Sequence, residues 1–209
     1  MKTILFILIS LMVMTAGIFY SEAKAEGDLK ATPGEHKILV VYYSRTGQNY
    51  VSGDIVNLSV GNTAAVAEII RQKTGADVFE IKTVKSYPAD YHEATEVAKK
   101  ELGEQARPEI AGGVDNIAQY DTIILGYPNW WGTMPMAVRS FLEKHDLSGK
   151  RILPFCTHEG SGMGRSEKDL RDALPKSVIK PGLPLKGTRV HRQDSGIPAE
   201  VEAWLKKNL

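Results

Sequence analysis

Three short groups of residues in this sequence are suited to binding a ligand, and the first follows an apolar stretch at positions 38–43. Its members carry hydroxyl, guanidinium and amide groups, and they lie on both sides of a fourteen-residue stretch. They are Ser44, Arg45, Thr46, Asn62 and Thr63. A strand, a small polar loop and a helix N-terminus together make a geometry that binds phosphate. The alternative is an ordinary connection in which hydroxyls only cap the helix, with the cap expected at Asn62 and Thr63.

The second group places two tryptophans in a polar loop. The loop reads Pro128-Asn129-Trp130-Trp131-Gly132 and follows another apolar stretch. A flat aromatic ring on a loop suits stacking against a flat heterocycle. The alternative is that the two indoles pack as a plug over the edge of a sheet.

The third group is rich in glycine and contains Thr157, Glu159, Gly160 and Gly162. Glycines let backbone amides come close to a ligand, here to the edge of a ring. A phosphate site, an aromatic surface and a glycine-lined surface together favour a pocket for flavin mononucleotide (FMN). The carboxylate of Glu159 would disfavour negative charge added to such a ring and so lower its reduction potential.

Apolar and alternating runs predict five strands, and amphipathic runs between them predict helices. The expected strands are residues 38–43, 76–83, 121–126 and 151–157, with a fifth within 178–185. The expected helices are residues 64–73, 91–105, 136–145, 166–174 and 199–208. This alternation predicts an α/β fold with a doubly wound parallel sheet and helices on both faces. Ligands of such sheets bind beyond the carboxyl ends of the strands, where all three groups are expected.

The first 36 residues are expected to lie outside the folded domain. Residues 1–25 have a basic start, an apolar run and the small-x-small sequence Ala23-Lys24-Ala25, which indicates a cleaved secretory signal peptide. An uncleaved membrane anchor is the alternative, although the apolar run is short for a span. Residues 26–36 read as a flexible lead-in, and residues 37–209 as one domain. We therefore expect an exported protein, periplasmic or extracellular, with no stable membrane span after cleavage.

Composition narrows the function classes. The chain has 26 basic and 25 acidic residues and no basic run, so nothing favours nucleic-acid binding. The single cysteine, Cys156, cannot form an intramolecular disulfide and is expected to be a buried small apolar residue. The five histidines show no metal-ligand spacing, so no metal site is expected.

Taken together, these motifs resemble those of the bacterial flavodoxin family over nearly the whole of residues 37–209. That family carries a run of the form Ser/Thr-x-Thr-Gly-Asn-Thr, and this chain has Ser44-Arg45-Thr46-Gly47, an insert, and then Asn62-Thr63. The family signature Gly-x-Pro-Thr-Trp corresponds to residues 126–130, with asparagine in place of threonine. The resemblance is closest to an exported subgroup with an expanded first loop. It implies a five-stranded sheet of order 2-1-3-4-5, bound FMN and one-electron chemistry.

The resemblance also implies roles for single residues. Ser44, Thr46 and Thr63 would offer hydroxyls to the phosphate, and Asn62 a side-chain amide. Trp130 matches the family's stacking tryptophan. Trp131 is an additional residue that could take this role instead, and residues 157–164 would line the ring edge.

The insert, Gln48 to Gly61, has two open outcomes. It could fold away as a hairpin around Ser52-Gly53-Asp54, or it could lie over the flavin and control access. The expected function is an FMN-binding redox protein that carries electrons to or from an envelope partner. The alternative is an FMN-dependent reductase that takes electrons from a nicotinamide and passes them to a small quinone-like acceptor.

Overall fold

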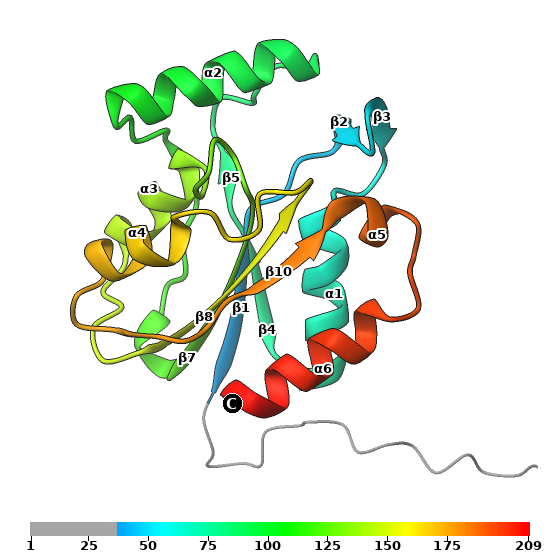
Figure 1. The fold of residues 1–209 in the computed structure, drawn as a ribbon. Helices are drawn as coiled ribbons and strands as arrows, with labels where there is room; N and C mark the ends of the chain where they lie inside the picture. The colour runs from blue at the N-terminus through cyan, green and yellow to red at the C-terminus, as the bar shows by residue number, and fades with distance from the viewer. Residues whose placement is uncertain (1–36) are drawn as a thin grey trace, which may run out of the picture.

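The computed structural model describes residues 37–209, so the expected signal peptide and lead-in lie outside the described residues. A parallel sheet forms the centre, with helices packed on both of its faces (Figure 1). The strands of this sheet are β1 (Ile38–Tyr42), β4 (Asp77–Glu80), β7 (Thr122–Pro128), β8 (Arg151–His158), β9 (Val178–Ile179) and β10 (Leu183–Lys186). The helices are α1 (Asn62–Thr74), α2 (Tyr91–Glu104), α3 (Met136–Lys144), α4 (Ser166–Ala173), α5 (Gly187–His191) and α6 (Ile197–Asn208), with a short 3-10 turn at Ile117–Gln119.

The order of the strands across the sheet is β10-β8-β7-β1-β4, and every pairing in it is parallel. Counted along the chain, this is the predicted order 2-1-3-4-5, which is therefore confirmed. The predicted single fifth strand was wrong in one detail, because two strands, β9 and β10, pair in turn with β8. Pro181 lies between them and has no N–H to donate, which interrupts the ladder.

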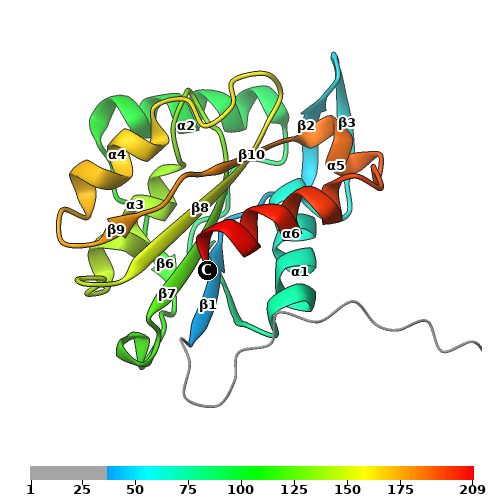
Figure 2. The ribbon, with the colours of Figure 1, turned by 60° about the horizontal axis from the view of Figure 1, so that its bottom comes forward.

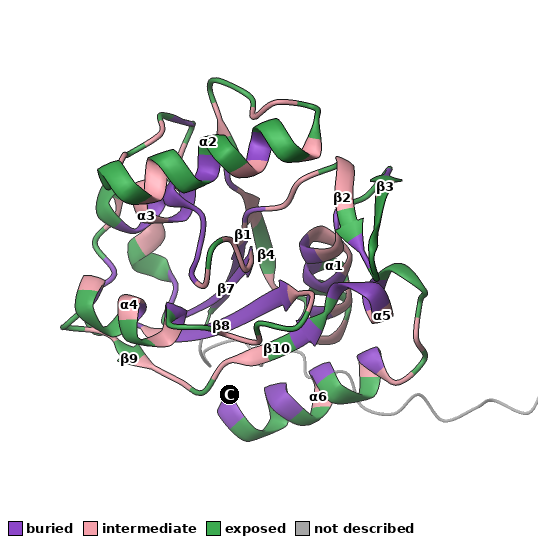
Figure 3. Cartoon of the chain, turned by 45° about the horizontal axis from the view of Figure 1, so that its top comes forward, coloured by how far each residue is buried: buried purple, intermediate pink, exposed green. Residues whose placement is uncertain are grey.

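The central strands are buried on both faces because successive side chains enter two separate cores. On β1, Leu39 and Val41 belong to the core under α3 and α4, whereas Ile38 and Val40 belong to the core under α1 and α6. Strands buried on both sides read as continuous apolar runs, which is the pattern that predicted them. Figure 3 shows β7 and β8 as largely buried ribbons between these layers.

Helix α2 differs from the other long helices, because it lies across the carboxyl-end edge of the sheet instead of packing flat on a face (Figures 1 and 2). Asp90 caps it by accepting a hydrogen bond from the Glu93 amide at 2.9 Å. Only Ala94 and Ala98 among its residues are buried. The expected amphipathic surface helix is present, and its apolar side faces the region beyond the strand ends.

The insert after β1 folds as a two-stranded antiparallel hairpin, β2 (Gly47–Val51) and β3 (Asp54–Leu58). Ser52 and Gly53 form its two-residue turn, with φ values of 55° and 108°. Two positive φ values match the twist of a tight hairpin turn. A second small pairing joins β5 (Lys82–Thr83) to β6 (Ile110–Ala111). Within the described part of the chain, no helix is both long and apolar enough to cross a membrane.

Candidate functional site

A cavity of about 290 Å³ opens beyond the carboxyl ends of the central strands. Segments far apart in the sequence meet there: the loop after β1, the hairpin, the first turns of α1 and α2, and the loops after β7 and β8. The predicted site residues that line it are Ser44, Arg45, Asn62, Thr63, Pro128, Asn129, Trp130, Trp131, Thr157 and Glu159. Three loops were expected to meet at one edge, and the structure brings all three to this cavity.

The N-terminus of α1 forms the polar end of the cavity. The helix is capped by Gly61, which has extended backbone and makes no side-chain bond, so the expected cap at Asn62 and Thr63 was wrong. The Ser44 hydroxyl takes the capping role by accepting a hydrogen bond from the Ala64 amide at 3.1 Å. The amides of Asn62 and Thr63 come before it and have no hydrogen-bond partner within residues 37–209. Free first-turn amides are the groups that bind anions.

Two buried hydroxyls connect α1 to the sheet at this end. Thr63 Oγ1 and Thr157 Oγ1 lie 2.8 Å apart, and both residues are at most 5% exposed. In such a pair one hydroxyl donates and the other accepts, so the accepting hydroxyl keeps its own hydrogen for a further acceptor. The pair can therefore donate one hydrogen bond to an anion at the helix end.

The close approach of backbone segments keeps this end rigid. A Cβ atom on Gly61 would lie 2.2 Å from Ser44 Oγ and 2.5 Å from the Arg45 carbonyl oxygen. A Cβ on Gly187, at the start of α5, would lie 2.7 Å from the Asn62 side-chain nitrogen. The Arg45 backbone leaves no room for a larger residue at Gly61, so packing fixes the spacing of the first loop and α1. At Gly187 the crowding atoms belong to the side chains of Asn62 and Glu159.

The loop after β7 is held to the loop after β8 by Asn129. Its side-chain amide donates to the Gly162 carbonyl at 2.8 Å, and its side-chain oxygen accepts from the Gly132 amide at 3.0 Å. The Gly132 carbonyl in turn accepts from the Arg165 amide at 2.8 Å. Both polar atoms of the Asn129 side chain are used in these bonds, which accounts for asparagine at the position where the similar motif has threonine.

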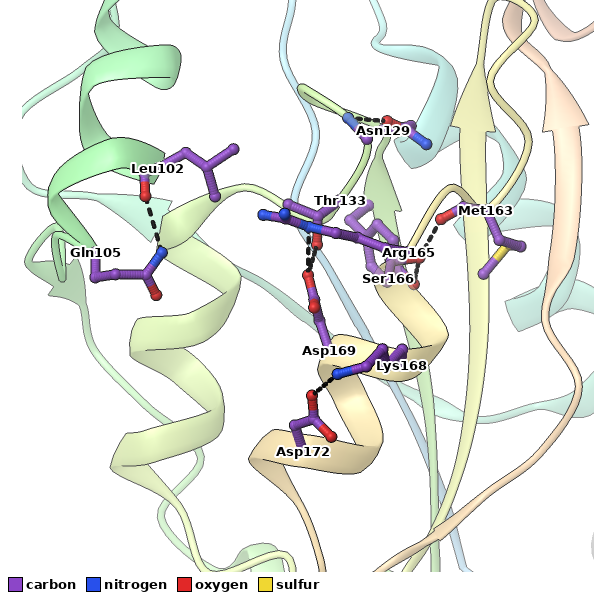
Figure 4. Close-up of polar contacts among 12 residues, drawn as sticks. Leu102, Gln105, Asn129, Thr133, Met163, Arg165, Ser166, Lys168, Asp169 and Asp172 are labelled. Carbon is purple, nitrogen blue, oxygen red and sulfur yellow. Dashed lines mark hydrogen bonds and ion pairs between the residues drawn. The ribbon is translucent and has the colours of Figure 1, made fainter.

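The same two loops are also joined at the start of α4. Asp169 accepts a hydrogen bond from the Thr133 hydroxyl at 2.6 Å and forms an ion pair with Arg165 at 3.2 Å (Figure 4). The Ser166 hydroxyl donates to the Met163 carbonyl at 2.6 Å and accepts from the buried Tyr127 hydroxyl at 2.9 Å. Each loop therefore braces the other.

The two tryptophans have different environments. Trp130 packs edge-on against Tyr43 and Tyr87, with ring centroids 5.4 Å and 5.1 Å away, and contacts the core under α3. Trp131 is 49% exposed and has a left-handed backbone with φ 53°. Its indole N–H donates to the Thr95 carbonyl on α2 at 2.9 Å. Both rings line the cavity, and Trp131 is the more exposed of the two.

Four predicted site residues do not line the cavity. Thr46 is exposed and stands just before the hairpin, so its hydroxyl is not placed at the α1 end. Gly160 is exposed with φ 127°. Gly132 and Gly162 carry the hydrogen bonds to Asn129 instead. These three glycines shape and join the loops and do not contact the space within.

Arg45 lines the cavity, yet its guanidinium is bound to backbone elsewhere. It donates to the Pro88 carbonyl at 2.6 Å and the Ala89 carbonyl at 2.8 Å, and also to the Asp90 and Gln48 carbonyls. Burial lowers the pKa of Arg45 from its usual value, but the group stays protonated at neutral pH. Its role is to tie the first loop to the segment that leads into α2.

Glu159 and His158 extend the site at the end of β8. Both carboxylate oxygens of Glu159 accept hydrogen bonds from Thr188, at 2.5 Å from the amide and 2.6 Å from the hydroxyl. His158 accepts a hydrogen bond from the Gly160 amide at 2.9 Å, and burial lowers its pKa. Cys156 is fully buried below them, and burial raises the pKa of its thiol to about 12. An inert thiol of this kind agrees with its prediction as a small core residue.

Sequence reasoning missed several residues of the cavity. They are Asn49, Tyr50, Tyr91, Thr95, Ala98 and Gly187. The residues of α2 were missed because an amphipathic helix gives no sign of lying across the strand ends. Tyr50 could have been found, since the sequence left open an insert lying over the site.

Comparison with known proteins agrees with this geometry. A sequence model of the family described as Flavodoxin matches residues 37–207. A candidate flavoprotein from Bacteroides uniformis ATCC 8492 is 28% identical with a TM-score of 0.64, covering 82% of this chain and 98% of its own. A candidate flavoprotein from Bacteroides eggerthii DSM 20697 is 29% identical with a TM-score of 0.61, covering 78% and 98%.

A flavoprotein from Lactobacillus acidophilus NCFM, solved in complex with FMN, is 19% identical with a TM-score of 0.53. The alignment includes 98% of that protein and 76% of this chain, and at 19% identity the similarity shows a shared fold only. Because the family match spans most of the sequence, the chain belongs to the flavodoxin family.

Proposed function

We propose that the cavity binds FMN and that the protein carries electrons to or from a redox partner in the cell envelope. The observation that carries the proposal is one cavity lined both by the amide end of α1 and by an exposed indole, in a chain of the flavodoxin family. A phosphate ester and a flat ring are the two parts of FMN that such a cavity can bind.

The α1 end suits the phosphate. The amides of Asn62 and Thr63 and the spare hydroxyl of the Thr63–Thr157 pair can each donate to a phosphate oxygen. A hydrogen bond to a charged group contributes about 1.5–3 kcal/mol. Three such bonds and a stacked ring can together reach the roughly −8 kcal/mol that corresponds to micromolar binding.

The opposite end suits the ring. Trp131 offers a half-exposed indole, held in place by its bond to Thr95 and by Lys99, whose ammonium lies 5.1 Å from the ring centroid. When bound, FMN supplies the capacity to store and release electrons. The carboxylate of Glu159, held by Thr188, lines the cavity beside Asn62, on the α1 side.

A quinone-type reductase driven by a nicotinamide is the second candidate function. The observation that favours it is the neutral charge balance, 26 basic against 25 acidic residues, because a carrier that attracts its partners through a large negative field would need an acidic surface. Export favours the carrier, since nicotinamide dinucleotides are kept inside the cytoplasm.

The location of the protein is part of the proposal. The sequence of residues 1–25 supports export, which places the partner outside the cytoplasm. Fractionation of cells that produce the full chain tests this point: recovery of a shortened protein in the exported fraction supports it, and a full-length cytoplasmic protein contradicts it.

The function is tested by titrating the purified protein with FMN and following the flavin absorbance. We expect binding of one FMN per chain with a dissociation constant of about 1 µM or lower. The loaded protein is then mixed with NADPH and a quinone. A carrier will oxidise NADPH slowly and will take up electrons in two separate one-electron steps in a potentiometric titration, whereas steady turnover would identify a reductase.

A further inference from the structure

The hairpin β2–β3 forms one wall of the proposed FMN cavity through Asn49 and Tyr50. Its two ends are anchored to the body of the protein, because Val51 and Leu58 are both 5% exposed. Tyr50 is 41% exposed and stands opposite Ile55 in the hairpin register. The insert is therefore neither folded away from the site nor loose: it is a packed element with an aromatic side chain at the cavity.

The base of the hairpin is fixed to the start of α2. The Gln48 side chain accepts a hydrogen bond from the Tyr91 amide at 2.9 Å. Arg45, just before the hairpin, binds the carbonyls of Pro88 and Ala89. These bonds join segments more than forty residues apart and set the width of the opening between the hairpin and α2.

An aromatic pair connects the hairpin to α2. The rings of Tyr50 and Tyr91 are stacked, with centroids 6.2 Å apart and an angle of 27° between their planes. Both residues line the cavity. The Tyr50 hydroxyl makes no hydrogen bond within residues 37–209, so its contribution there comes from the ring.

We propose that Tyr50, stacked on Tyr91, excludes a second flat ring from the cavity and so makes the protein selective against nicotinamide donors. This inference rests on the proposed function, because it concerns access to the FMN that the cavity would hold. It assigns the insert a role in choosing the redox partner: single-electron exchange with a protein is allowed, and hydride transfer from a dinucleotide is not.

The chemistry explains why one ring makes this difference. A nicotinamide gives up a hydride, which is two electrons and one proton together, from C4 of its ring and becomes the oxidised nicotinamide. That transfer needs the reacting atoms about 3–3.5 Å apart, so the donor ring must lie against the acceptor. An electron alone passes without such contact. A tyrosine pair across the opening therefore blocks the first process and permits the second.

The test compares three variants of the full protein: Tyr50→Ala, the conservative Tyr50→Phe, and Ile55→Ala. Ile55 is the cross-strand neighbour of Tyr50, is 40% exposed and does not line the cavity. It controls for loss of apolar bulk from the same hairpin. Two rates are measured for each FMN-loaded protein: release of FMN after dilution, followed by flavin fluorescence, and anaerobic bleaching of the flavin by excess NADPH.

For Tyr50→Ala we expect both rates to rise by about twofold to tenfold, the range of one aromatic pair. Tyr50→Phe should restore the slow rates, and Ile55→Ala should match the unchanged protein. If Tyr50→Ala behaves like Ile55→Ala, or if only FMN release becomes faster, the selectivity role is wrong. If the unchanged protein binds no FMN, the proposed function itself is wrong. That result can be told apart from a failure of the selectivity role, which requires a protein that binds FMN.

Discussion

The two sides of the cavity differ in the chemistry and the burial of their residues. The side formed by α1 and the end of β8 is polar and buried, and the first loop approaches α1 so closely that Gly61 has no room for a side chain. The side formed by α2, the hairpin and the loop after β7 is aromatic and partly exposed, with Trp131 and Tyr50 both more than 40% accessible.

This difference indicates that the two sides of the cavity have separate roles in ligand binding. Short hydrogen bonds and close packing cannot relax, so the α1 side can hold an anion at one fixed place. Stacked rings on the surface contribute about 0.5–1.5 kcal/mol for each pair, which is small enough to be overcome. The polar side is therefore suited to affinity, and the aromatic side to access and partner choice.

Crowding the polar side should have the largest effect. Gly61→Ala places a methyl group against Ser44 Oγ and the Arg45 carbonyl, which forces the loop away from α1. Overpacking of this kind costs about 1–3 kcal/mol of folding stability. We expect FMN affinity to fall by about a hundredfold, close to 2.8 kcal/mol, measured by absorbance titration beside urea unfolding.

Gly103→Ala is the matched control for that substitution. Gly103 lies in α2 with open space around its Cβ position, so alanine should stabilise the helix by about 0.5–1 kcal/mol and leave FMN affinity unchanged. Equal affinities for the two variants would show that the α1 end does not hold the ligand.

Removing one hydroxyl of the buried pair should have the next largest effect. Thr63→Val leaves the Thr157 hydroxyl buried without a partner, at a cost of about 1–3 kcal/mol in stability. FMN affinity should fall by about tenfold, because the pair loses its spare donor. The double variant with Thr157→Val should be less unstable than the sum of the two single variants. Additive stability losses in urea unfolding would contradict the pairing.

Changes on the aromatic side should act on binding more than on stability. Trp131→Ala should weaken FMN binding by about tenfold and change the unfolding free energy by less than about 1 kcal/mol, since the side chain is half exposed. Trp131→Phe should keep most of the affinity. Trp130→Ala should instead destabilise the fold by about 3–5 kcal/mol, because that ring packs against Tyr43 and Tyr87. The reverse pattern would assign the stacking ring to Trp130.

The smallest effect concerns pH. Burial lowers the pKa of His158 below its usual 6.5. Just below pH 6.5, therefore, His158 is protonated in the unfolded chain and remains neutral in the folded protein. Stability is therefore complete above pH 6.5 and declines as pH falls toward the lower folded pKa. Urea midpoints between pH 5 and pH 8 should show a shallow slope that is reduced in His158→Gln. A slope that runs the opposite way would contradict burial of the neutral ring.

Much of the fold and of the candidate site could be predicted from the sequence, because both depend on local sequence patterns. The apolar run at Ile38–Tyr42 and the polar loop after it predicted the strand, the helix end and the participation of Ser44 and Thr63. The pattern could not show that Gly61 would be the helix cap, since that depends on Ser44 reaching across from β1.

The rest depends on tertiary placement. Thr46 matches the family motif, yet it is exposed just before the hairpin and does not line the cavity. Tyr91 and Thr95 enter the cavity because α2 crosses the strand ends, and no periodicity in its sequence indicates that. The sequence did not indicate the short helix α5, although Gly187 at its start lines the cavity.

The central claim is that two unlike sides of one cavity bind the same ligand. Amide NMR spectra of the isotope-labelled protein, recorded as FMN is added, test it most directly. We predict that the backbone signals of Asn62 and Thr63 and the indole N–H signal of Trp131 shift together and saturate at one FMN per chain. Shifts confined to one side, or shifts elsewhere with these three signals unmoved, would contradict the account.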